Sequence, residues 1–213
     1  MNVAIIDYGS GNLRSATKAF EQAVSELGGG TIKLTKDPDG LKNFSHIVLP
    51  GVGAFSDCMT RLSAIDGLIE SLQEQVFIKA KPFLGICVGM QLMADVGREH
   101  GKTDGFGWIP GEVISISPHN RNIKVPHMGW NDLQIIDTTH PFVQDLLEGV
   151  HTYFVHSYHF VTKDRSHVLA TVNYGKPLTA IVGRDNLIGT QFHPEKSQRT
   201  GLRFIKNFLG WRP

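Results

Sequence analysis

The chain has 213 residues, 41% of them hydrophobic and 19% charged, which is the composition of a globular protein and excludes a disordered chain. Its 21 Lys and Arg residues balance 20 Asp and Glu residues, so the net charge of +1 lacks the basic excess typical of nucleic-acid binding. Two cysteines are too few for a disulfide framework, and no signal peptide or membrane-spanning apolar run is evident. We therefore expect a cytoplasmic protein without nucleic-acid or membrane partners.

The first half of the chain alternates apolar strand patterns with helical patterns. The strand patterns are short and apolar throughout, which is typical of a parallel sheet covered on both faces. The helical patterns repeat apolar residues at the spacing of one helix face. We expect strands at Val3–Ile6, Ile32–Leu34, His46–Leu49 and Pro82–Ile86, with helices at Leu13–Leu27, Leu62–Lys79 and Val88–Asp95.

After Gly97 the pattern changes to short β-rich segments, which continue over residues 108–174. Two apolar runs, Leu178–Val182 and Leu187–Thr190, are then joined by turn residues and predict a hairpin. An amphipathic helix is expected over Arg199–Leu209. We therefore expect an α/β fold with an open, mostly parallel central sheet flanked by helices and a β-rich antiparallel or mixed extension, in a single domain over residues 1–213.

The sharpest local feature is Pro82–Gln91, an apolar strand followed by Gly-x-Cys-x-Gly and a helical pattern. Small residues two positions before and after Cys87 permit the sharp strand-to-helix turn of a nucleophile elbow, which exposes the side chain between them. At such a turn the helix dipole favours a thiolate on Cys87, and the Val88 N–H can donate to an oxyanion. The alternative is a buried core cysteine in front of a helix.

A thiol nucleophile needs a base, and among ten histidines His193 stands out because it lies just past the carboxyl end of an apolar strand. Glu195 can orient the imidazole as the acid of a triad does, and Pro194 makes the turn between them rigid. Taken alone, His-Pro-Glu is also typical of a surface turn. The chain order Cys, His, Glu argues against a papain-like protease, which needs an Asn downstream of the His.

A second glycine-rich turn, Pro50-Gly51-Val52-Gly53, follows the strand His46–Leu49. It lacks the residues of a phosphate-binding loop. We interpret it as a second wall of an oxyanion site, with the N–H of Val52 or Gly53 directed at the developing charge. An ordinary strand-to-helix turn is the alternative.

Two other groups carry no chemistry in our interpretation. His156 and His159 are three residues apart, and on a strand such residues face opposite sides, so we expect no metal site there. Cys58 lies in a helical pattern and is interpreted as a packing residue. We also expect no cofactor.

Taken together, these motifs resemble the class I (triad) glutamine amidotransferases. The resemblance rests on Gly85–Gln91 and on His193-Pro194-Glu195, and it extends from the first strand to the last helix. Within the family, the sequence is similar to the branch that supplies ammonia to imidazole glycerol phosphate synthases in histidine biosynthesis. The segments typical of that branch are Asp7–Leu13, Pro50–Phe55, Gly107–Gly111, Val125–Asn131 and Tyr153–Tyr158.

The resemblance implies that Cys87 attacks the side-chain amide of glutamine, that His193 passes the proton to the leaving ammonia, and that Glu195 orients His193. It also implies an oxyanion hole and a substrate-binding set. The oxyanion hole would consist of Val52, Gly53 and Val88, and the glutamine would contact Gly53, Gln91, Ser157 and Tyr158. The resemblance leaves open whether the Val52–Gly53 peptide turns before catalysis.

The same resemblance implies a heterodimer with a separate (β/α)8 synthase subunit. That subunit would receive the ammonia through a tunnel and form imidazole glycerol phosphate and an aminoimidazole carboxamide ribotide. We interpret Val125–Asn131 as a docking loop because Met and Trp are enriched at interface cores. The expected partner contacts are Pro126, Met128, Trp130 and Lys196. A core turn with a buried Trp130 is the alternative.

Other functions also fit the motifs. The chain could be the glutaminase subunit of another amidotransferase, or a free-standing cysteine hydrolase that acts without a partner. A non-catalytic binding module is a further alternative, although intact Cys87, His193 and Glu195 argue against it.

Overall fold

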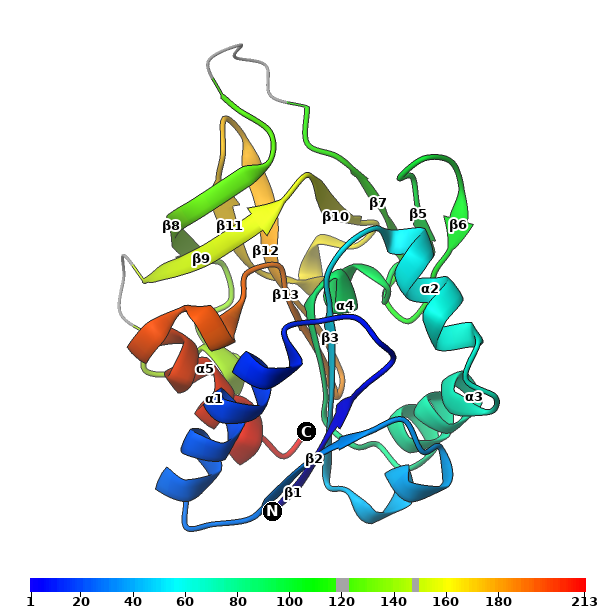
Figure 1. The fold of residues 1–213 in the computed structure, drawn as a ribbon. Helices are drawn as coiled ribbons and strands as arrows, with labels where there is room; N and C mark the ends of the chain where they lie inside the picture. The colour runs from blue at the N-terminus through cyan, green and yellow to red at the C-terminus, as the bar shows by residue number, and fades with distance from the viewer. Residues whose placement is uncertain (118–122, 147–149) are drawn as a thin grey trace.

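The computed structural model describes residues 1–117, 123–146 and 150–213 (Figure 1). Its strands form one sheet in the order β2-β1-β3-β4-β13-β12-β11-β8-β9 and a second in the order β10-β7-β5-β6. The strands are β1 (Asn2–Ile6), β2 (Thr31–Thr35), β3 (His46–Gly51), β4 (Phe83–Cys87), β5 (Val96–Gly97), β6 (Thr103–Asp104), β7 (Gly111–Ser115), β8 (His127–Ile135), β9 (His151–His156), β10 (Tyr158–Thr162), β11 (Val168–Asn173), β12 (Pro177–Arg184) and β13 (Leu187–Thr190).

The helices alternate with the strands in the first half of the chain and return at its end. The α-helices are α1 (Leu13–Glu26), α2 (Phe55–Ser63), α3 (Leu68–Gln73), α4 (Val88–Gln91) and α5 (Gln198–Gly210). Shorter helical segments are η1 (Asp39–Asn43), η2 (Glu74–Ile78), η3 (Pro141–Val143), η4 (Arg165–His167) and η5 (Pro194–Lys196).

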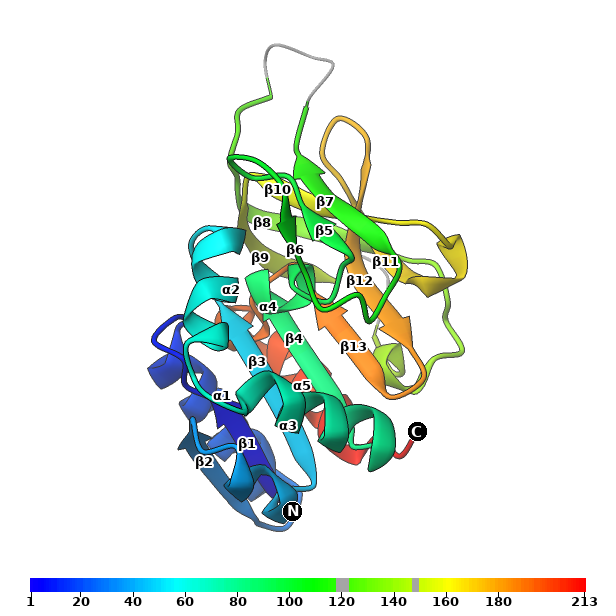
Figure 2. The same ribbon diagram turned by 90° about the vertical axis from the view of Figure 1, so that its right-hand side faces the viewer.

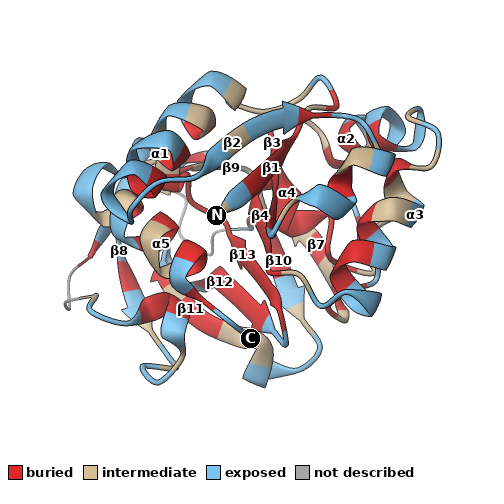
Figure 3. Cartoon of the chain, turned by 90° about the horizontal axis from the view of Figure 1, so that it is seen from below, coloured by how far each residue is buried: buried red, intermediate tan, exposed pale blue. Residues whose placement is uncertain are grey.

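The half of the large sheet that contains β2, β1, β3, β4 and β13 is parallel. Strands β3, β4 and β13 are buried at every residue, as their apolar sequences predict. Helices α1 and α5 cover one face of this half, while α2 and α3 cover the other, so the buried strands lie between two helical layers (Figure 3). The expected parallel sheet flanked by helices is therefore confirmed.

The other half of the large sheet is antiparallel. The predicted hairpin is formed by β12 and β13, and β11, β8 and β9 continue the sheet in antiparallel order. The predicted β-rich extension is therefore confirmed. The second sheet is an addition that the sequence did not predict: the chain bends at Ser157, leaves β9 and pairs as β10 with β7 (Figure 2).

The helix predicted over Leu62–Lys79 is wrong in its bounds. The structure starts α2 earlier, at Phe55, whose N–H donates to Glu99 Oε2 at 2.8 Å. Gly67 then adopts a left-handed conformation with φ of 72° and separates α2 from α3. A glycine adopts this conformation at little cost, so it can end one helix and begin the next.

The helix predicted over Val88–Asp95 is reduced to the single turn of α4. The reason is that N–H groups of a following loop form hydrogen bonds with the carbonyl groups that would otherwise accept the next bonds of the helix. The N–H groups of Phe106, Gly107 and Trp108 donate to the carbonyls of Leu92, Ala94 and Met93, at 2.8 Å, 2.9 Å and 2.9 Å. A helix of one turn has a small dipole, so less stabilisation of a Cys87 thiolate comes from α4 than the sequence predicted.

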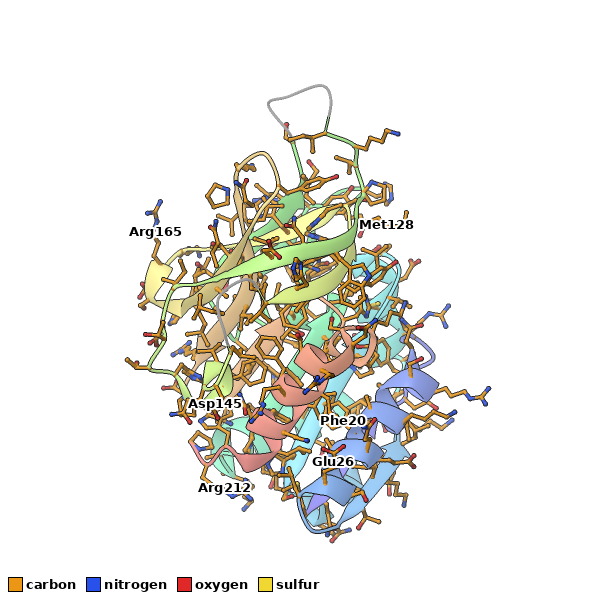
Figure 4. All side chains as sticks on the ribbon, turned by 90° about the vertical axis from the view of Figure 1, so that its left-hand side faces the viewer. Phe20, Glu26, Met128, Asp145, Arg165 and Arg212 are labelled. Atoms are coloured by element: carbon orange, nitrogen blue, oxygen red, sulfur yellow. The ribbon has the colours of Figure 1, made fainter. Side chains whose placement is uncertain are left out.

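A hydrophobic cluster extends from β1 to the C-terminal segment and includes Val3, Phe83 and Trp211. On the face covered by α1 and α5, Phe20 of α1, which is labelled in Figure 4, meets Phe208 of α5 edge to face with ring centroids 6.4 Å apart. Within the described part of the chain, every helix is too short or too polar to cross a bilayer.

Candidate active site

Three neighbouring parallel strands bring the predicted catalytic residues to one edge of the large sheet. Gly51 at the end of β3 pairs with Cys87 at the end of β4, and His193 follows β13 on the other side of β4. Carboxyl ends of parallel strands are where open α/β sheets form their binding sites. Residues that are far apart in the sequence therefore meet around Cys87.

A cavity of about 300 Å³ lies at this edge. Most of the predicted catalytic, oxyanion and substrate residues line it, as does one predicted partner contact: Val52, Gly53, Cys87, Val88, Gln91, Pro126, Ser157, Tyr158 and His193. Its wall also contains Glu99, Val155 and His156, which sequence reasoning did not select. Glu195 lies outside the lining because it is behind the His193 ring.

The turn at Cys87 has the geometry of a nucleophile elbow. Cys87 has φ of 55°, a conformation that costs a non-glycine residue about 1–3 kcal/mol. Both flanking glycines are sterically required: a Cβ on Gly85 would lie 2.5 Å from Gly89 O, and a Cβ on Gly89 would lie 1.9 Å from Leu49 O. The strained turn is therefore held by close backbone packing, and it presents Cys87 to the cavity.

His193 and Glu195 form a buried pair. His193 Nδ1 lies 2.8 Å from Glu195 Oε1, and both side chains are 2% exposed. The turn that connects them is fixed by Ser197, whose hydroxyl donates to His193 O at 2.7 Å. His193 Nε2, the other ring nitrogen, has no hydrogen-bond partner in the described residues and belongs to the cavity that Cys87 lines.

The electrostatics of this pair favour a protonated imidazole. Burial alone would lower the pKa of His193, but its interactions with Cys87 and Glu195 outweigh burial and raise that pKa to about 10. At neutral pH His193 is therefore an imidazolium that Glu195 holds by Nδ1. The protonated His193 ring therefore holds a transferable proton next to Cys87.

The glycine-rich turn after β3 is held by Ser10. The Ser10 hydroxyl donates to Val52 O at 2.6 Å and accepts from Val52 N–H at 3.2 Å, while Cys58 Sγ lies 3.5 Å from the same carbonyl. The Val52 N–H is therefore engaged with Ser10 and is not available to an oxyanion in this arrangement. In a trans peptide the Gly53 N–H is antiparallel to the Val52 carbonyl, so it points away from Ser10.

A buried glutamine that the sequence analysis missed contacts the cysteine. Gln191 is fully buried, and its Nε2 lies 3.8 Å from Cys87 Sγ. Its Oε1 accepts from Gln91 Nε2 at 3.0 Å, and Gln91 Nε2 also donates to Tyr158 O at 3.1 Å. The only sequence signal was its place between strand β13 and His193.

The predicted partner contacts gather beside the cavity. The segment interpreted as a docking loop forms strand β8 from His127 onward, which corrects the expected loop. Met128 and Trp130 are 62% and 48% exposed, so the alternative of a buried Trp130 is wrong. Met128 projects from the surface (Figure 4), and both Trp130 and Lys196 lie against the ring of Tyr153.

Two further sequence predictions concerned the pair His156 and His159 and the residue Cys58. His156 and His159 lie on different strands, β9 and β10, rather than on one. No three His, Cys, Asp or Glu side chains are grouped to hold a metal ion in the parts of the chain that the structure describes. Cys58 is buried in α2, and burial raises the pKa of its thiol.

Comparison with known proteins identifies the family of the chain. A family model described as "Glutamine amidotransferase class-I" matches residues 4–210, and the chain belongs to this family. Two relatives carry the name "Imidazole glycerol phosphate synthase subunit HisH". The Rhodospirillum rubrum protein is 55% identical over 214 residues and the Agrobacterium fabrum protein 54% over 217 residues, with 100% of both chains covered in each case. Within class I, the chain is thus similar over its full length to HisH subunits.

Solved structures agree on the fold. A crystal structure of a glutamine amidotransferase has a TM-score of 0.71 at 18% identity and covers 97% of this chain and 96% of its own. The glutaminase domain of Trypanosoma brucei CTPS, solved with bound acivicin, has a TM-score of 0.64 at 16% identity and covers 98% and 94%. At these identities the likeness extends to the fold alone.

Proposed function

We propose that this chain hydrolyses glutamine to glutamate and ammonia as the glutaminase subunit of an imidazole glycerol phosphate synthase. Cys87 is the nucleophile, His193 the acid and base, and Glu195 the residue that orients His193. The observation that carries the proposal is the common cavity of Cys87 and His193, with Glu195 2.8 Å behind the imidazole. Its HisH relatives, identical over more than half of the aligned residues, support the same function.

The reaction begins with attack of the Cys87 sulfur on the side-chain carbonyl carbon of glutamine. The carbonyl oxygen becomes an oxyanion, and the imidazolium of His193 gives its proton to the nitrogen as ammonia leaves. The remaining γ-glutamyl thioester is attacked by water, which loses a proton to the now neutral His193. The C–S bond breaks, glutamate leaves, and Cys87 and His193 return to their starting state.

The oxyanion and the substrate are held by groups around the elbow. We assign the stabilisation of the oxyanion to the N–H groups of Val88 and Gly53, because the Val52 N–H already donates to Ser10. Gln91 uses its Nε2 within the protein, which leaves its Oε1 to accept a hydrogen bond from the substrate. The carboxylate of Glu99 in the cavity wall suits the α-ammonium group of glutamine.

We propose that the released ammonia passes to a (β/α)8 synthase subunit that docks beside the cavity mouth. Pro126 lines the cavity, and Met128 and Trp130 expose large apolar side chains next to it. Exposed Met and Trp side chains of this kind are enriched at interface cores. A heterodimer formed here would place the synthase next to the point at which ammonia is released.

The proposal is tested first by chemical labelling. A chloroketone analogue of glutamine is added to the purified chain, and the modified peptide is identified by mass spectrometry. We expect the label on Cys87. Because the chain has one other cysteine, Cys58, a label there instead would contradict the assigned nucleophile.

The second test measures glutamate release by the chain alone and together with its synthase subunit. We expect turnover to depend strongly on the synthase, and Cys87→Ala to abolish it while the complex still uses added ammonia. Strong turnover without the synthase would favour a free-standing cysteine hydrolase. Glutamine hydrolysis by Cys87→Ala would overturn the mechanism.

A further inference from the structure

Two buried imidazoles that the proposed mechanism does not use lie beside the cavity. His127 on β8 and His156 at the end of β9 are 3% and 6% exposed, and His127 Nδ1 lies 2.9 Å from His156 Nε2. The ring of His127 is stacked between Phe154 and Tyr174, with centroids 4.7 Å and 4.0 Å away. Both rings are therefore held in fixed positions.

The atoms at the two ends of this pair determine where the protons are. His156 Nδ1 lies 2.8 Å from Tyr158 O, which can only accept, so His156 carries its proton on Nδ1. In a neutral ring Nε2 is then an acceptor, so His127 Nδ1–H must donate to it. His127 Nε2 is the remaining acceptor, and Asn131 Nδ2 lies 3.1 Å from it.

The far end of the chain of hydrogen bonds is consistent with this direction. Asn131 Oδ1 accepts from Asp132 N–H at 2.8 Å, and Nδ2 also donates to Asn173 O at 3.1 Å, which fixes the orientation of the amide. Burial keeps both rings neutral: it lowers the pKa of His127 to about 4 and that of His156 to about 3. Every donor therefore points the same way, from Asn131 towards Tyr158.

The chain of hydrogen bonds ends on the carbonyl that also holds Gln91, a predicted substrate-binding residue. Tyr158 O accepts from His156 Nδ1 and from Gln91 Nε2, at 2.8 Å and 3.1 Å. Gln91 then contacts Gln191, whose Nε2 reaches Cys87 Sγ. The position of the bend at residues 157–158 is thus coupled to the two glutamines that surround the nucleophile.

We propose that His127 and His156 are positioning residues of the glutamine site, which act as neutral Nδ1–H tautomers to hold the Tyr158 carbonyl and, through it, Gln91. The proposal rests on the assignment of this cavity to glutamine. The series of hydrogen bonds begins in β8. The alternation of side chains along this strand places His127 and Asn131 on its inner side and Met128 and Trp130 on its outer side. The strand that carries the expected docking surface thus also supports the substrate site.

The tautomers are tested directly by NMR, without reference to activity. The full-length chain is labelled with ¹⁵N-histidine, and two-bond ¹H–¹⁵N spectra are recorded at pH 7. We expect the rings of His127 and His156 each to give the signals of a neutral imidazole protonated on Nδ1. The signals of His127 are identified by their absence from the spectrum of His127→Phe, and those of His156 by their absence from the spectrum of His156→Phe. An Nε2–H tautomer or a charged ring at either position would overturn the proposal.

The positioning role is tested by kinetics of the complex with the synthase subunit. His127→Phe keeps the stacking but loses the donor, and we expect the KM for glutamine to rise about fivefold, the effect of one hydrogen bond of ~1 kcal/mol. His127→Asn can donate from nearly the position of Nδ1, so most of the affinity should return. An unchanged KM in His127→Phe would overturn the proposal.

His159→Phe is the matched control. His159 is also a buried histidine next to Tyr158, but neither ring nitrogen has a partner in the described residues. We expect no change in KM from this variant, and an equal rise would show that the effect of His127→Phe is a general result of lost core packing. If the wild-type complex does not hydrolyse glutamine, the proposed function fails, and the NMR result still decides the hydrogen-bond chain.

Discussion

Gln191 Nε2 lies 3.8 Å from Cys87 Sγ, so the sulfur contacts a buried amide donor in addition to sharing its cavity with His193. The amide orientation is set by Gln91, which donates to Gln191 Oε1 at 3.0 Å. A neutral donor held in a buried site stabilises negative charge on sulfur without reorganisation. In the proposed mechanism, Gln191 therefore belongs to the environment that makes Cys87 reactive.

Replacing Gln191 by Glu tests this contact. Glu can still accept from Gln91, but it places an oxygen where the donor to Cys87 was. We expect kcat/KM for glutamine to fall at least about tenfold, the effect of one hydrogen bond to a charged group. Steady-state glutaminase assays of the complex measure the change.

Gln75→Glu is the control for the cost of burying a carboxylate. Gln75 is another buried glutamine, in η2 and outside the cavity lining. We expect it to lower the unfolding midpoint while kcat/KM of the folded protein stays within about twofold of wild type. Full activity in Gln191→Glu would show that the 3.8 Å contact has no catalytic role.

Gly53→Ala tests whether the glycine-rich turn after β3 supplies an oxyanion donor. Gly53 has φ of 96° with nothing within 4 Å of an added Cβ, so the substitution meets backbone strain and no clash. The strain costs about 1–3 kcal/mol of stability, and its relief would move the Gly53 N–H. We expect glutamine hydrolysis to fall about a hundredfold, the usual cost of one oxyanion donor.

Gly28→Ala isolates the strain. Gly28 has φ of 98° and equally open space, but it lies after α1, outside the cavity lining. Urea denaturation should give the two variants similar losses of stability, while only Gly53→Ala loses activity. If both variants keep full activity in the complex, the Gly53 N–H is not the donor.

The sequence predicted those parts of the site that depend on short local patterns. Gly-x-Cys-x-Gly begins in the last residues of one apolar strand, and His-Pro-Glu follows shortly after another. Neighbouring parallel strands bring the residues at their carboxyl ends to one edge of the sheet. Gln191 was missed because its role depends on which way one buried side chain turns, and that is decided by Gln91. The early end of α4 was missed because N–H groups of a loop more than ten residues downstream bind the carbonyls of the residues that follow this helix. Such tertiary hydrogen bonds leave no periodic pattern in the sequence.

The His193–Glu195 pair predicts a pH dependence of stability. The pKa of His193 is raised to about 10 in the folded protein, so the folded state binds this proton more tightly than the unfolded chain. The resulting stabilisation is fully present below about pH 6.5, the ordinary value for His, and is lost as the pH rises towards 10. Glu195→Gln removes part of the rise in the pKa of His193, because Glu195 is one of the groups that raise it. We therefore expect its loss of unfolding free energy, relative to wild type, to be larger at about pH 6.5 than at about pH 10.

Urea denaturation of both proteins across this pH range measures the difference. Asp137→Asn is the control, because the hydrogen bonds from Thr139 lower the pKa of Asp137 below its usual acidic value and it stays ionised throughout. Its effect on stability should be constant over the same pH range. A constant effect of Glu195→Gln as well would mean that Glu195 does not hold the proton on His193.

The exposed face of β8 predicts where the partner binds. Trp130 is 48% exposed and Met128 62% exposed, so truncating either removes little packing within the chain itself. A Trp buried at the centre of an interface contributes at least about 2 kcal/mol, which corresponds to about a thirtyfold change in Kd. We expect Trp130→Ala to weaken binding of the synthase subunit by at least that factor in calorimetric titration, with an unchanged unfolding midpoint. Ile136→Ala, an exposed apolar residue just past the other end of the strand, should change Kd less than about threefold. An unchanged Kd in Trp130→Ala would show that the partner does not contact the Met128–Trp130 end of β8, and the docking surface would then have to be sought on another face.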